Sequence, residues 1–484
     1  MKHSKRHPLI MGTMILTITG LVSRVIGFFY RIYLSRLFGE EGMGIYQLIN
    51  PVLALTFSLT AAGYQTAISK FVAEYSASER SAKEKNRLLL PLFTGLSISL
   101  PLSFFCTGFL FCFSDFIAAH FLLEPRTAPM LRILSFSLPM GAVHSCINGY
   151  FYGIKKTAVP AASQLVEQLA RVACVYCVSF RMISLGKSPS INVAVLGLAA
   201  GEFISMLLSV FSVWLIYAGR SSAKNSSVSG NPSSGNLSPG SLCSGSLCPN
   251  SLSSSLLPVY RGILSMALPL TANRIVLTLL HSIESVSLPA KLKLYGYDTA
   301  TSLSVYGVLT GMAIPLIFFP NALTNSVSVL LLPVISENYA LGNFKAVREA
   351  TRKTVKYCFL MGFACMLCFL FFGKWAGTAL FDSDLAGYFI TTLSFICPFI
   401  YLDTTLSSIL QGLGMAGRIF IINVLCQLLR LAFVFGAVPH FGITGYLWGM
   451  LAGQLLTSLL YLGCLSVHLK SCRTFRHKKQ GAAP

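Results

Sequence analysis

Four arginines lie near the middle of long apolar segments, and they are the residues of this sequence best suited to chemistry: Arg24, Arg171, Arg274 and Arg430. An arginine at the centre of a membrane helix costs about 2.5 to 3.5 kcal/mol on insertion scales, so these side chains are expected to face away from lipid. A guanidinium group binds phosphate and carboxylate oxygens through paired hydrogen bonds. The sequence therefore predicts a cationic cavity for an anionic substrate. The alternative is that acids and backbone carbonyls satisfy all four arginines within the helix packing.

Few acids lie within the apolar segments, where they could pair with these arginines. Glu167 precedes Arg171 by one helical turn, a spacing that favours a local ion pair. The position one turn before Arg430 is Cys426, so we expect Arg430 to keep a free charge and to matter more for an anionic substrate. Four further residues are candidates for binding a coupling proton or cation: Asp403, His144, Glu202 and Glu284.

The composition indicates the elements that must position these residues. The chain has 484 residues, of which 54% are hydrophobic and 11% charged, and its mean hydropathy is +0.68. A soluble domain needs a more charged surface, so the sequence predicts an all-α polytopic membrane protein. The net charge of +21 matters here through its distribution between loops, and it does not indicate a nucleic-acid partner.

A bilayer core needs about 20 apolar residues per helix, and this length predicts twelve transmembrane helices, six before and six after a Ser-rich stretch. The predicted spans are residues 9–37, 42–68, 88–114, 130–153, 160–183, 191–219, 260–284, 301–331, 354–374, 387–411, 417–439 and 442–468. The expected organisation is a six-helix lobe (1–219), a flexible cytoplasmic Ser/Gly-rich linker (220–258), a second six-helix lobe (259–469) and a basic cytoplasmic tail (470–484). Most Lys and Arg residues outside the spans fall on the side of the termini. This distribution predicts a cell-membrane protein with both termini in the cytoplasm.

The two halves of the sequence resemble each other at one fixed shift. That shift places the segment from Gln168 to Arg171 over the segment from Gln427 to Arg430, and it places His144 over Asp403. It also matches Leu134, Ser135, Phe136, Pro139 and Gly153 with Leu393, Ser394, Phe395, Pro398 and Gly412. A parallel repeat of this kind predicts two lobes related by an axis along the membrane normal, with substrate handled between them.

Two other motifs in the sequence do not indicate a cofactor. Residues 412–417 satisfy the G-x-G-x-x-G pattern, but no predicted strand precedes them, as a dinucleotide site would require. Two Cys-x-x-Cys pairs fall inside spans and are expected to pack as small apolar side chains: Cys174 with Cys177, and Cys365 with Cys368. We expect no catalytic residue, no metal and no cofactor, and hence no enzymatic activity.

The first two spans carry a family resemblance. Residues 23–28 (Ser-Arg-Val-Ile-Gly-Phe), 36–39 (Arg-Leu-Phe-Gly), 44–46 (Gly-Ile-Tyr) and 67–74 (Ala-Ile-Ser-Lys-Phe-Val-Ala-Glu) resemble the polysaccharide and lipid II flippases, in particular the branch similar to stage V sporulation protein B. These proteins belong to the multidrug/oligosaccharidyl-lipid/polysaccharide exporter superfamily. Lipid II flippases carry a further arginine where this sequence has Tyr30, and Arg31 stands beside it.

The resemblance implies two six-helix lobes that alternate between inward-open and outward-open states around a cationic cavity. It implies a monomeric transporter of a polyprenyl-pyrophosphate-linked saccharide, such as the peptidoglycan precursor lipid II, with membrane lipid as the other partner. Arg24, Arg31, Arg171, Arg274 and Arg430 are the candidate substrate-binding residues. Two alternatives remain open: a multidrug cation antiporter on the same fold, and a membrane-embedded glycosyltransferase or polymerase.

Overall fold

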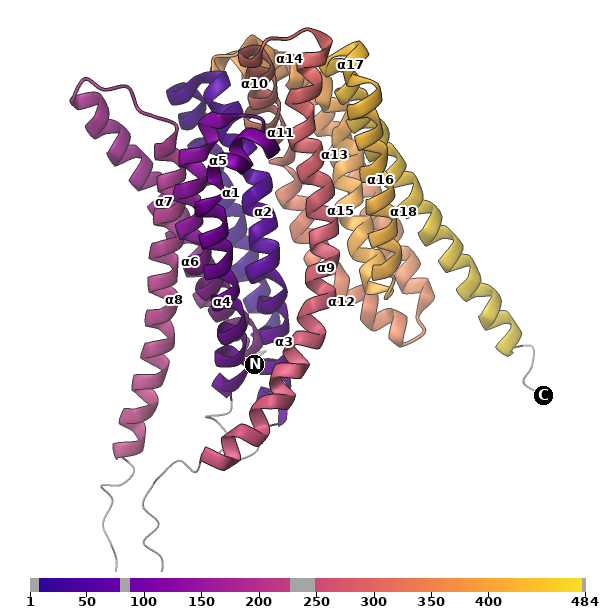
Figure 1. Cartoon of the computed structure of the whole chain (residues 1–484). Coiled ribbons are helices and arrows are strands. Elements are labelled where there is room, and N and C mark those ends of the chain that lie inside the picture. The colour runs from indigo at the N-terminus through magenta and orange to yellow at the C-terminus, as the bar shows by residue number, and fades with distance from the viewer. Residues whose placement is uncertain (1–7, 79–87, 227–248, 481–484) are drawn as a thin grey trace, which may run out of the picture.

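The structure is a computed structural model, and it describes residues 8–78, 88–226 and 249–480. All regular elements within these ranges are helices, as the sequence predicts. Figure 1 shows the N-terminal half, in indigo to magenta, beside the C-terminal half, in red to yellow. We call the two halves the N-lobe and the C-lobe. The two chain ends lie at one end of the bundle, which we call the termini end, and α10 and α14 lie at the opposite end.

The N-lobe contains the following elements: α1 (Pro8–Leu48), α2 (Asn50–Phe57), the π-helix η1 (Ser58–Ala62), α3 (Gly63–Ser78), α4 (Leu90–Cys112), α5 (Ser114–Phe116), η3 (Ile117–Phe121), η4 (Pro125–Thr127), α6 (Ala128–Gly153), α7 (Ala158–Ser184) and α8 (Asn192–Ser226). The C-lobe contains α9 (Pro249–Tyr295), α10 (Thr299–Gly307), the π-helix η5 (Val308–Ala313), α11 (Ile314–Phe318), α12 (Asn321–Ala340), α13 (Phe344–Phe381), α14 (Asp384–Leu393), η6 (Ser394–Ile396), α15 (Cys397–Gly412), α16 (Ala416–Gly436), α17 (Val438–Phe441) and α18 (Ile443–Gln480).

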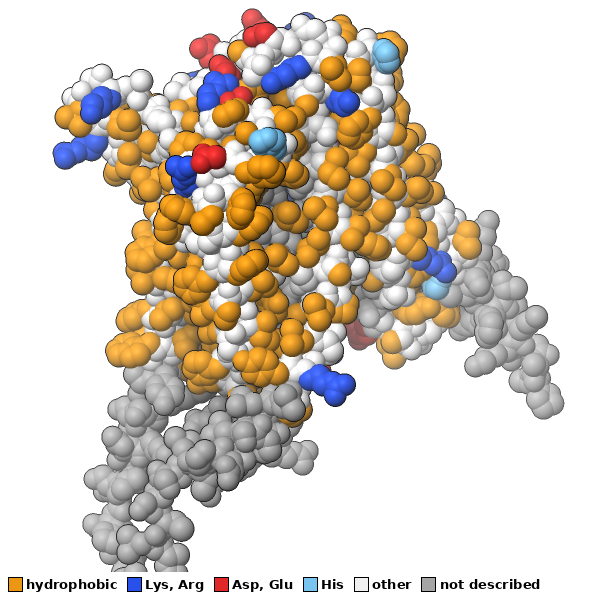
Figure 2. Space-filling model, viewed as in Figure 1, with side chains coloured by type: hydrophobic (Ala, Val, Ile, Leu, Met, Phe, Trp, Pro, Cys, Tyr) orange, Lys and Arg blue, Asp and Glu red, His pale blue; other side chains and the backbone are white. Residues whose placement is uncertain are grey.

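Hydropathy supports the predicted membrane passes. Within the described ranges, 10 stretches are long and apolar enough to cross a membrane, and the first of them, Met14–Ser76, contains two passes. The helix α7 is not among these stretches; Glu167 and Arg171 lie in its middle. Figure 2 shows hydrophobic side chains over the middle of the visible face, with charged side chains gathered towards the opposite end. The protein is therefore a multi-pass all-α membrane protein.

Several predicted boundaries differ from the structure. The first helix continues to Leu48, with a break at Gly39, whose φ of 69° belongs to the left-handed region that favours glycine. The predicted span 301–331 is broken between α11 and α12, beside Pro320. The helices α8 and α9 extend into the predicted linker up to Ser226 and from Pro249, and the rest of that linker lies outside the described residues. In the predicted tail, α18 continues to Gln480.

The repeat is visible in how the lobes pack. The first helix of each half lies against the second pass of the other half: α1 packs on α10 and η5, and α9 packs on α2, η1 and α3. Both second passes also contain a π-helical segment, η1 and η5. Gly307 allows the close approach of α10 to α1, since a Cβ there would lie 2.3 Å from the Glu40 carbonyl oxygen and the Gly44 nitrogen. Small residues permit this kind of backbone contact in membrane helices.

Two side chains of α1 join the lobes near the opposite end. Arg36 donates hydrogen bonds to the carbonyl oxygens of Ala379, at 2.7 Å, and Leu380, at 3.1 Å, in the last turn of α13. Glu40, one turn later, accepts a hydrogen bond of 2.5 Å from Ser383, the N-cap of α14. Arg36 therefore lies at the negative C-terminal end of the α13 dipole, and Glu40 lies at the positive N-terminal end of the α14 dipole. We call Arg36 and Glu40 the α1 clamp.

Candidate functional site

A cavity between the lobes holds two of the predicted arginines. Its volume is about 340 Å³, and Arg24 and Arg31 line it from α1. The two residues are seven positions apart, so two helical turns bring them to the same face. Arg31 thus lies beside Arg24 in the cavity, while Tyr30 is buried. The opposite wall comes from the broken eighth pass: Pro315, Phe318, Phe319 and Asn321.

This cavity adjoins two others. A cavity of about 300 Å³ shares Arg24 and continues along α1 past Gly20 and Thr17, towards the termini end. A cavity of about 360 Å³ shares Phe318 and Asn321 and extends into the C-lobe. The polar side chains that line this third cavity include His281, Asp403, Asn423, Gln427, Arg430 and Gln454. The three cavities, which we call the central cavity, therefore contact residues of both lobes.

The break between α11 and α12 positions the shared wall. Phe319 packs on Phe28 of α1, with ring centroids 5.4 Å apart. Asn321 begins α12, and its Oδ1 accepts hydrogen bonds from Thr324, at 2.5 Å, and from Thr404 of α15, at 2.9 Å. Pro320, directly before Asn321, has no backbone N–H to continue the helix. The break thus lies directly before Asn321, whose side chain lines the cavity wall and binds Thr404 of α15.

Three of the predicted arginines have no acidic partner. Within the described part of the chain, no carboxylate forms an ion pair with Arg24, Arg31 or Arg274. Arg24 is exposed and Arg31 half-buried, and both line the central cavity. Arg274 is exposed on α9 and lines none of the three cavities described above. The structure thus brings Arg24 and Arg31 together and leaves Arg274 apart from them.

The expectation that Arg430 keeps a free charge is wrong. Its Nη2 lies 2.5 Å from Oε1 of Glu284, which comes from α9 rather than from the helix of Arg430. Glu284 also accepts hydrogen bonds from Gln427, at 2.5 Å, and from the Tyr446 hydroxyl, at 2.8 Å. The Glu284 side chain is only 5% exposed. Of the predicted ion-coupling residues, Glu284 is therefore a structural partner that ties α9 to α16 and α18.

The expected pair in the N-lobe is confirmed. Nη2 of Arg171 lies 2.5 Å from Oε1 of Glu167, one turn earlier on α7. Because both groups belong to one helix, this ion pair joins no other element. Arg171 and Arg430 occupy equivalent positions of the repeat, yet their acids come from different helices. Neither of these arginines presents an unpaired charge to a substrate.

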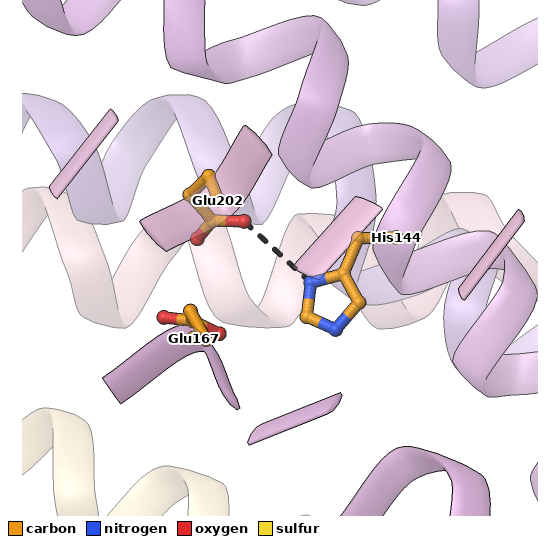
Figure 3. Close-up of side chains that lie close together, drawn as sticks. All are labelled: His144, Glu167 and Glu202. Atoms are coloured by element: carbon orange, nitrogen blue, oxygen red, sulfur yellow. Dashed lines mark ion pairs between the residues drawn. The ribbon is translucent and has the colours of Figure 1, made fainter. Parts of the chain in front are cut away.

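His144 and Glu202 lie beside Glu167, and Figure 3 shows these three side chains. Nδ1 of His144, on α6, lies 3.5 Å from Oε2 of Glu202, on α8. Together with a carboxylate oxygen of Glu167, these atoms lie within 4.8 Å of one another. On the other side of the ring, Nε2 contacts the amide nitrogen of Asn148, at 2.7 Å, and the hydroxyl of Ser205, at 3.0 Å.

Asp403, at the equivalent position of the C-lobe, has neutral partners. Its carboxylate accepts a hydrogen bond of 2.5 Å from Ser458 and another from Gln454, both on α18. The third cavity contacts it directly. Asp403 therefore has no cationic partner among the described residues, unlike Glu167 and Glu284.

Four contributors to this site were not predicted from the sequence. Asn321 and the aromatic pair Phe318 and Phe319 line the shared wall, but only the proline at position 320 hinted at a break there. Tyr446 completes the partners of Glu284. The serines around His144 were also missed, although Ser205 and Ser209 fall on the same face of α8 as Glu202.

Comparison with known proteins identifies the family. The sequence model described as "Polysaccharide biosynthesis protein" matches residues 9–339, and the MatE model matches residues 293–435. Stage V sporulation protein B of Bacillus subtilis (strain 168) is 27% identical over 457 residues, which cover 94% of this chain and 83% of that protein. Lipid II flippase MurJ of the same organism is 21% identical over 361 residues, covering 72% of this chain and 61% of that protein.

Solved structures share the fold. A multidrug resistance MATE family transporter in an inward-facing conformation matches with a TM-score of 0.67 and 15% identity, covering 93% of this chain and 96% of that one. Lipid II flippase MurJ in an inward closed conformation matches with the same TM-score, 0.67, and 15% identity, covering 94% and 87%. These likenesses confirm the fold of two six-helix lobes. Since the first family model covers more than half of the sequence, the chain belongs to the polysaccharide biosynthesis protein family.

Proposed function

We propose that this protein is a flippase that moves a polyprenyl-pyrophosphate-linked saccharide across the cytoplasmic membrane by alternating access. The observation that carries the proposal is the pair of unpaired arginines, Arg24 and Arg31, on one face of α1 in a cavity between the lobes. Two guanidinium groups without acidic partners suit the oxygens of a pyrophosphate, because they replace the water that this anion loses on entry. The peptidoglycan precursor lipid II is one substrate of this class.

In this mechanism the prenyl chain stays in the bilayer while the pyrophosphate and the saccharide cross through the central cavity. The α1 clamp and the Gly307 contact hold α1 against the C-lobe near the opposite end. The described cavities lead from Arg31 towards the termini end. With both termini in the cytoplasm, this arrangement would admit the substrate from the inside. Arg274, on α9, would meet it only in another state of the cycle, and the protein would act as a monomer.

The competing functions differ in the charge and chemistry that they require. A multidrug cation antiporter would have to bring a cation past Arg24 and Arg31, which repel it. A glycosyltransferase or polymerase would turn over sugar donors. If the protein is a flippase instead, the purified protein should release no product from a sugar nucleotide or from a lipid-linked saccharide.

Asp403, which lines the cavity without a cationic partner among the described residues, is the residue most consistent with cation binding in the C-lobe.

The test is a flipping assay with purified protein in liposomes that contain a fluorescent polyprenyl-pyrophosphate saccharide. Loss of one charge-assisted contact to a desolvated phosphate costs about 2 to 5 kcal/mol, so Arg24→Gln and Arg31→Gln should each lower apparent affinity about thirtyfold or more. Arg418→Gln is the matched control, because Arg418 is exposed and lies outside the central cavity. Unchanged flipping by the Arg24→Gln/Arg31→Gln double variant would refute the proposal, and ethidium efflux with no lipid flipping would favour the antiporter.

A further inference from the structure

The polar cluster of the N-lobe does not balance its charges. It contains the guanidinium of Arg171, the carboxylates of Glu167 and Glu202, and the imidazole of His144. With a neutral imidazole, the sum of these groups is one negative charge. The Glu202 side chain is 20% exposed and that of His144 11% exposed. An uncompensated charge at this depth of a membrane protein is costly, and one bound proton would remove it.

The contacts of His144 provide a place for that proton. Nδ1 faces Glu202, whose Oε2 has no hydrogen-bond donor among the described residues. On the other side, Nε2 faces the amide of Asn148, whose Oδ1 is buried without a partner. With the amide nitrogen towards Nε2, the ring is neutral. Rotation of the amide by half a turn would turn Oδ1 towards Nε2 and satisfy the N–H of a charged imidazolium. The site can thus satisfy both protonation states.

We propose that the N-lobe binds one exchangeable proton, shared between His144 and Glu202, with Glu167 and Arg171 setting the local charge. Proton binding itself does not depend on the flippase proposal; only its role in the transport cycle does. When the site is occupied, an imidazolium lies against the Glu202 carboxylate and the cluster is neutral. When it is empty, the four groups together carry one negative charge.

Buried serines provide a route to this site. The hydroxyls of Ser163 and Ser205 each lie 3.0 Å from Nε2 of His144 and 2.7 Å from each other. Ser209 continues the chain, 3.1 Å from Ser163. All three serines are fully buried, and a hydroxyl can donate and accept at once, as proton relay requires. Because α8 runs from Asn192 towards Ser226 at the termini end, this chain leads from His144 in that direction.

The neighbouring helices carry further charged and titratable groups, and only Arg31 among them adds an unpaired charge near the cluster. Lys70 and Glu74, on α3, pair with each other at 3.7 Å. The helix α4, which also packs on α6, has no acidic or basic side chain. From α1, Tyr30 and Tyr46 lie near Arg171. Arg31 lies near Arg171 too, but it lines the central cavity, so its charge is available to a bound anion and is not counted within the cluster.

The test is a titration of the full-length protein, labelled with ¹⁵N-histidine in lipid bilayers and followed by NMR. The chain has 8 histidines, so the signal of His144 is assigned by its loss in His144→Gln. The carboxylates of Glu202 and Glu167 lie within 4.8 Å of the imidazole of His144. A negative charge this close raises the proton affinity of an imidazole about tenfold or more, so Glu202→Gln and Glu167→Gln should each lower the titration midpoint of His144 by about one pH unit or more. Arg171→Gln should raise it, because this variant removes a positive charge from the cluster.

Asp403→Asn is the matched control, since it removes the equivalent carboxylate of the C-lobe and should leave the midpoint unchanged. A His144 signal that does not titrate between pH 5 and 9, or one that ignores both Glu202→Gln and Arg171→Gln, would overturn the proposal. So would a signal that titrates only after Zn²⁺ is removed, because the site would then hold a metal. None of these measurements uses the lipid-linked substrate, so failure of the flippase proposal would not affect them.

Discussion

Breaking the ion pair between Arg430 and Glu284 should destabilise the C-lobe strongly. In Arg430→Ala the carboxylate of Glu284, only 5% exposed, would lose its arginine and keep two neutral donors, Gln427 and Tyr446, with Nδ1 of His281 3.6 Å away. Removing one partner of a buried pair costs about 3 to 5 kcal/mol. Because two good hydrogen bonds remain, we expect the lower half of that range.

The expected loss can be read as a melting temperature. Unfolding entropy scales with chain length, so 1 kcal/mol corresponds to about 2 °C for a lobe of this size. Arg430→Ala should therefore melt about 6 to 8 °C below the parent protein when purified in detergent and followed by light scattering or intrinsic fluorescence. The double variant Arg430→Met/Glu284→Gln removes both charges and keeps the donors of Gln427 and Tyr446. It should recover most of the loss, because no unpaired charge stays buried.

Two results would contradict this reasoning. If Arg430→Ala has the same melting temperature as the parent protein, the ion pair between Glu284 and Arg430 does not stabilise the folded state. If the double variant is as unstable as the single one, the loss comes from packing rather than from a stranded charge. Arg418→Ala is the matched control, since this exposed arginine forms no ion pair with a described carboxylate and donates to the sulfur atoms of Met415 and Cys464.

Two further predictions concern the conformation and the orientation of the protein. Removing the α1 clamp by Arg36→Ala should shift the population towards states in which the two lobes separate at the end of the bundle that carries α10 and α14. Spin labels on α1 and α14 should then report longer distances. Unchanged distances would show that the clamp does not hold the lobes together. In a Cys-free background, a single cysteine at Tyr295 should react with a membrane-impermeant maleimide in intact cells, while one at Lys345 should react only after lysis, and the reverse pattern would invert the proposed orientation.

The sequence predicted the contacts that are local and missed those that are not. The pair between Glu167 and Arg171 could be predicted because one helical turn fixes the distance between the two side chains. The partner of Arg430 is 146 positions away on another helix, and only the packing of α9 on α16 brings the two together. Spacing alone therefore led to the wrong conclusion that this charge is free.

The same distinction applies to the membrane passes. Most of them followed from hydropathy, because the bilayer requires a fixed length of apolar helix, although α7, with Glu167 and Arg171 in its middle, is not among the stretches that hydropathy identifies in the described residues. The break between α11 and α12, which positions Asn321, depends on how the eighth pass meets α15, and Pro320 alone does not reveal which side chain it exposes. The repeat predicted that Arg171 and Arg430 are equivalent in position, but it carried no information about their partners.

The two sides of the α1 clamp should tolerate mutation to different degrees. Arg36 donates to backbone carbonyl oxygens, those of Ala379 and Leu380, and almost every amino acid provides the same acceptor at these positions. Substitutions in the last turn of α13 therefore leave the contact chemically intact, whereas most substitutions of Arg36 abolish it. Suppressors of an Arg36 defect cannot arise by restoring a complementary side chain on α13, so compensating mutations should accumulate elsewhere, beginning with Ser383 and its neighbours at the start of α14.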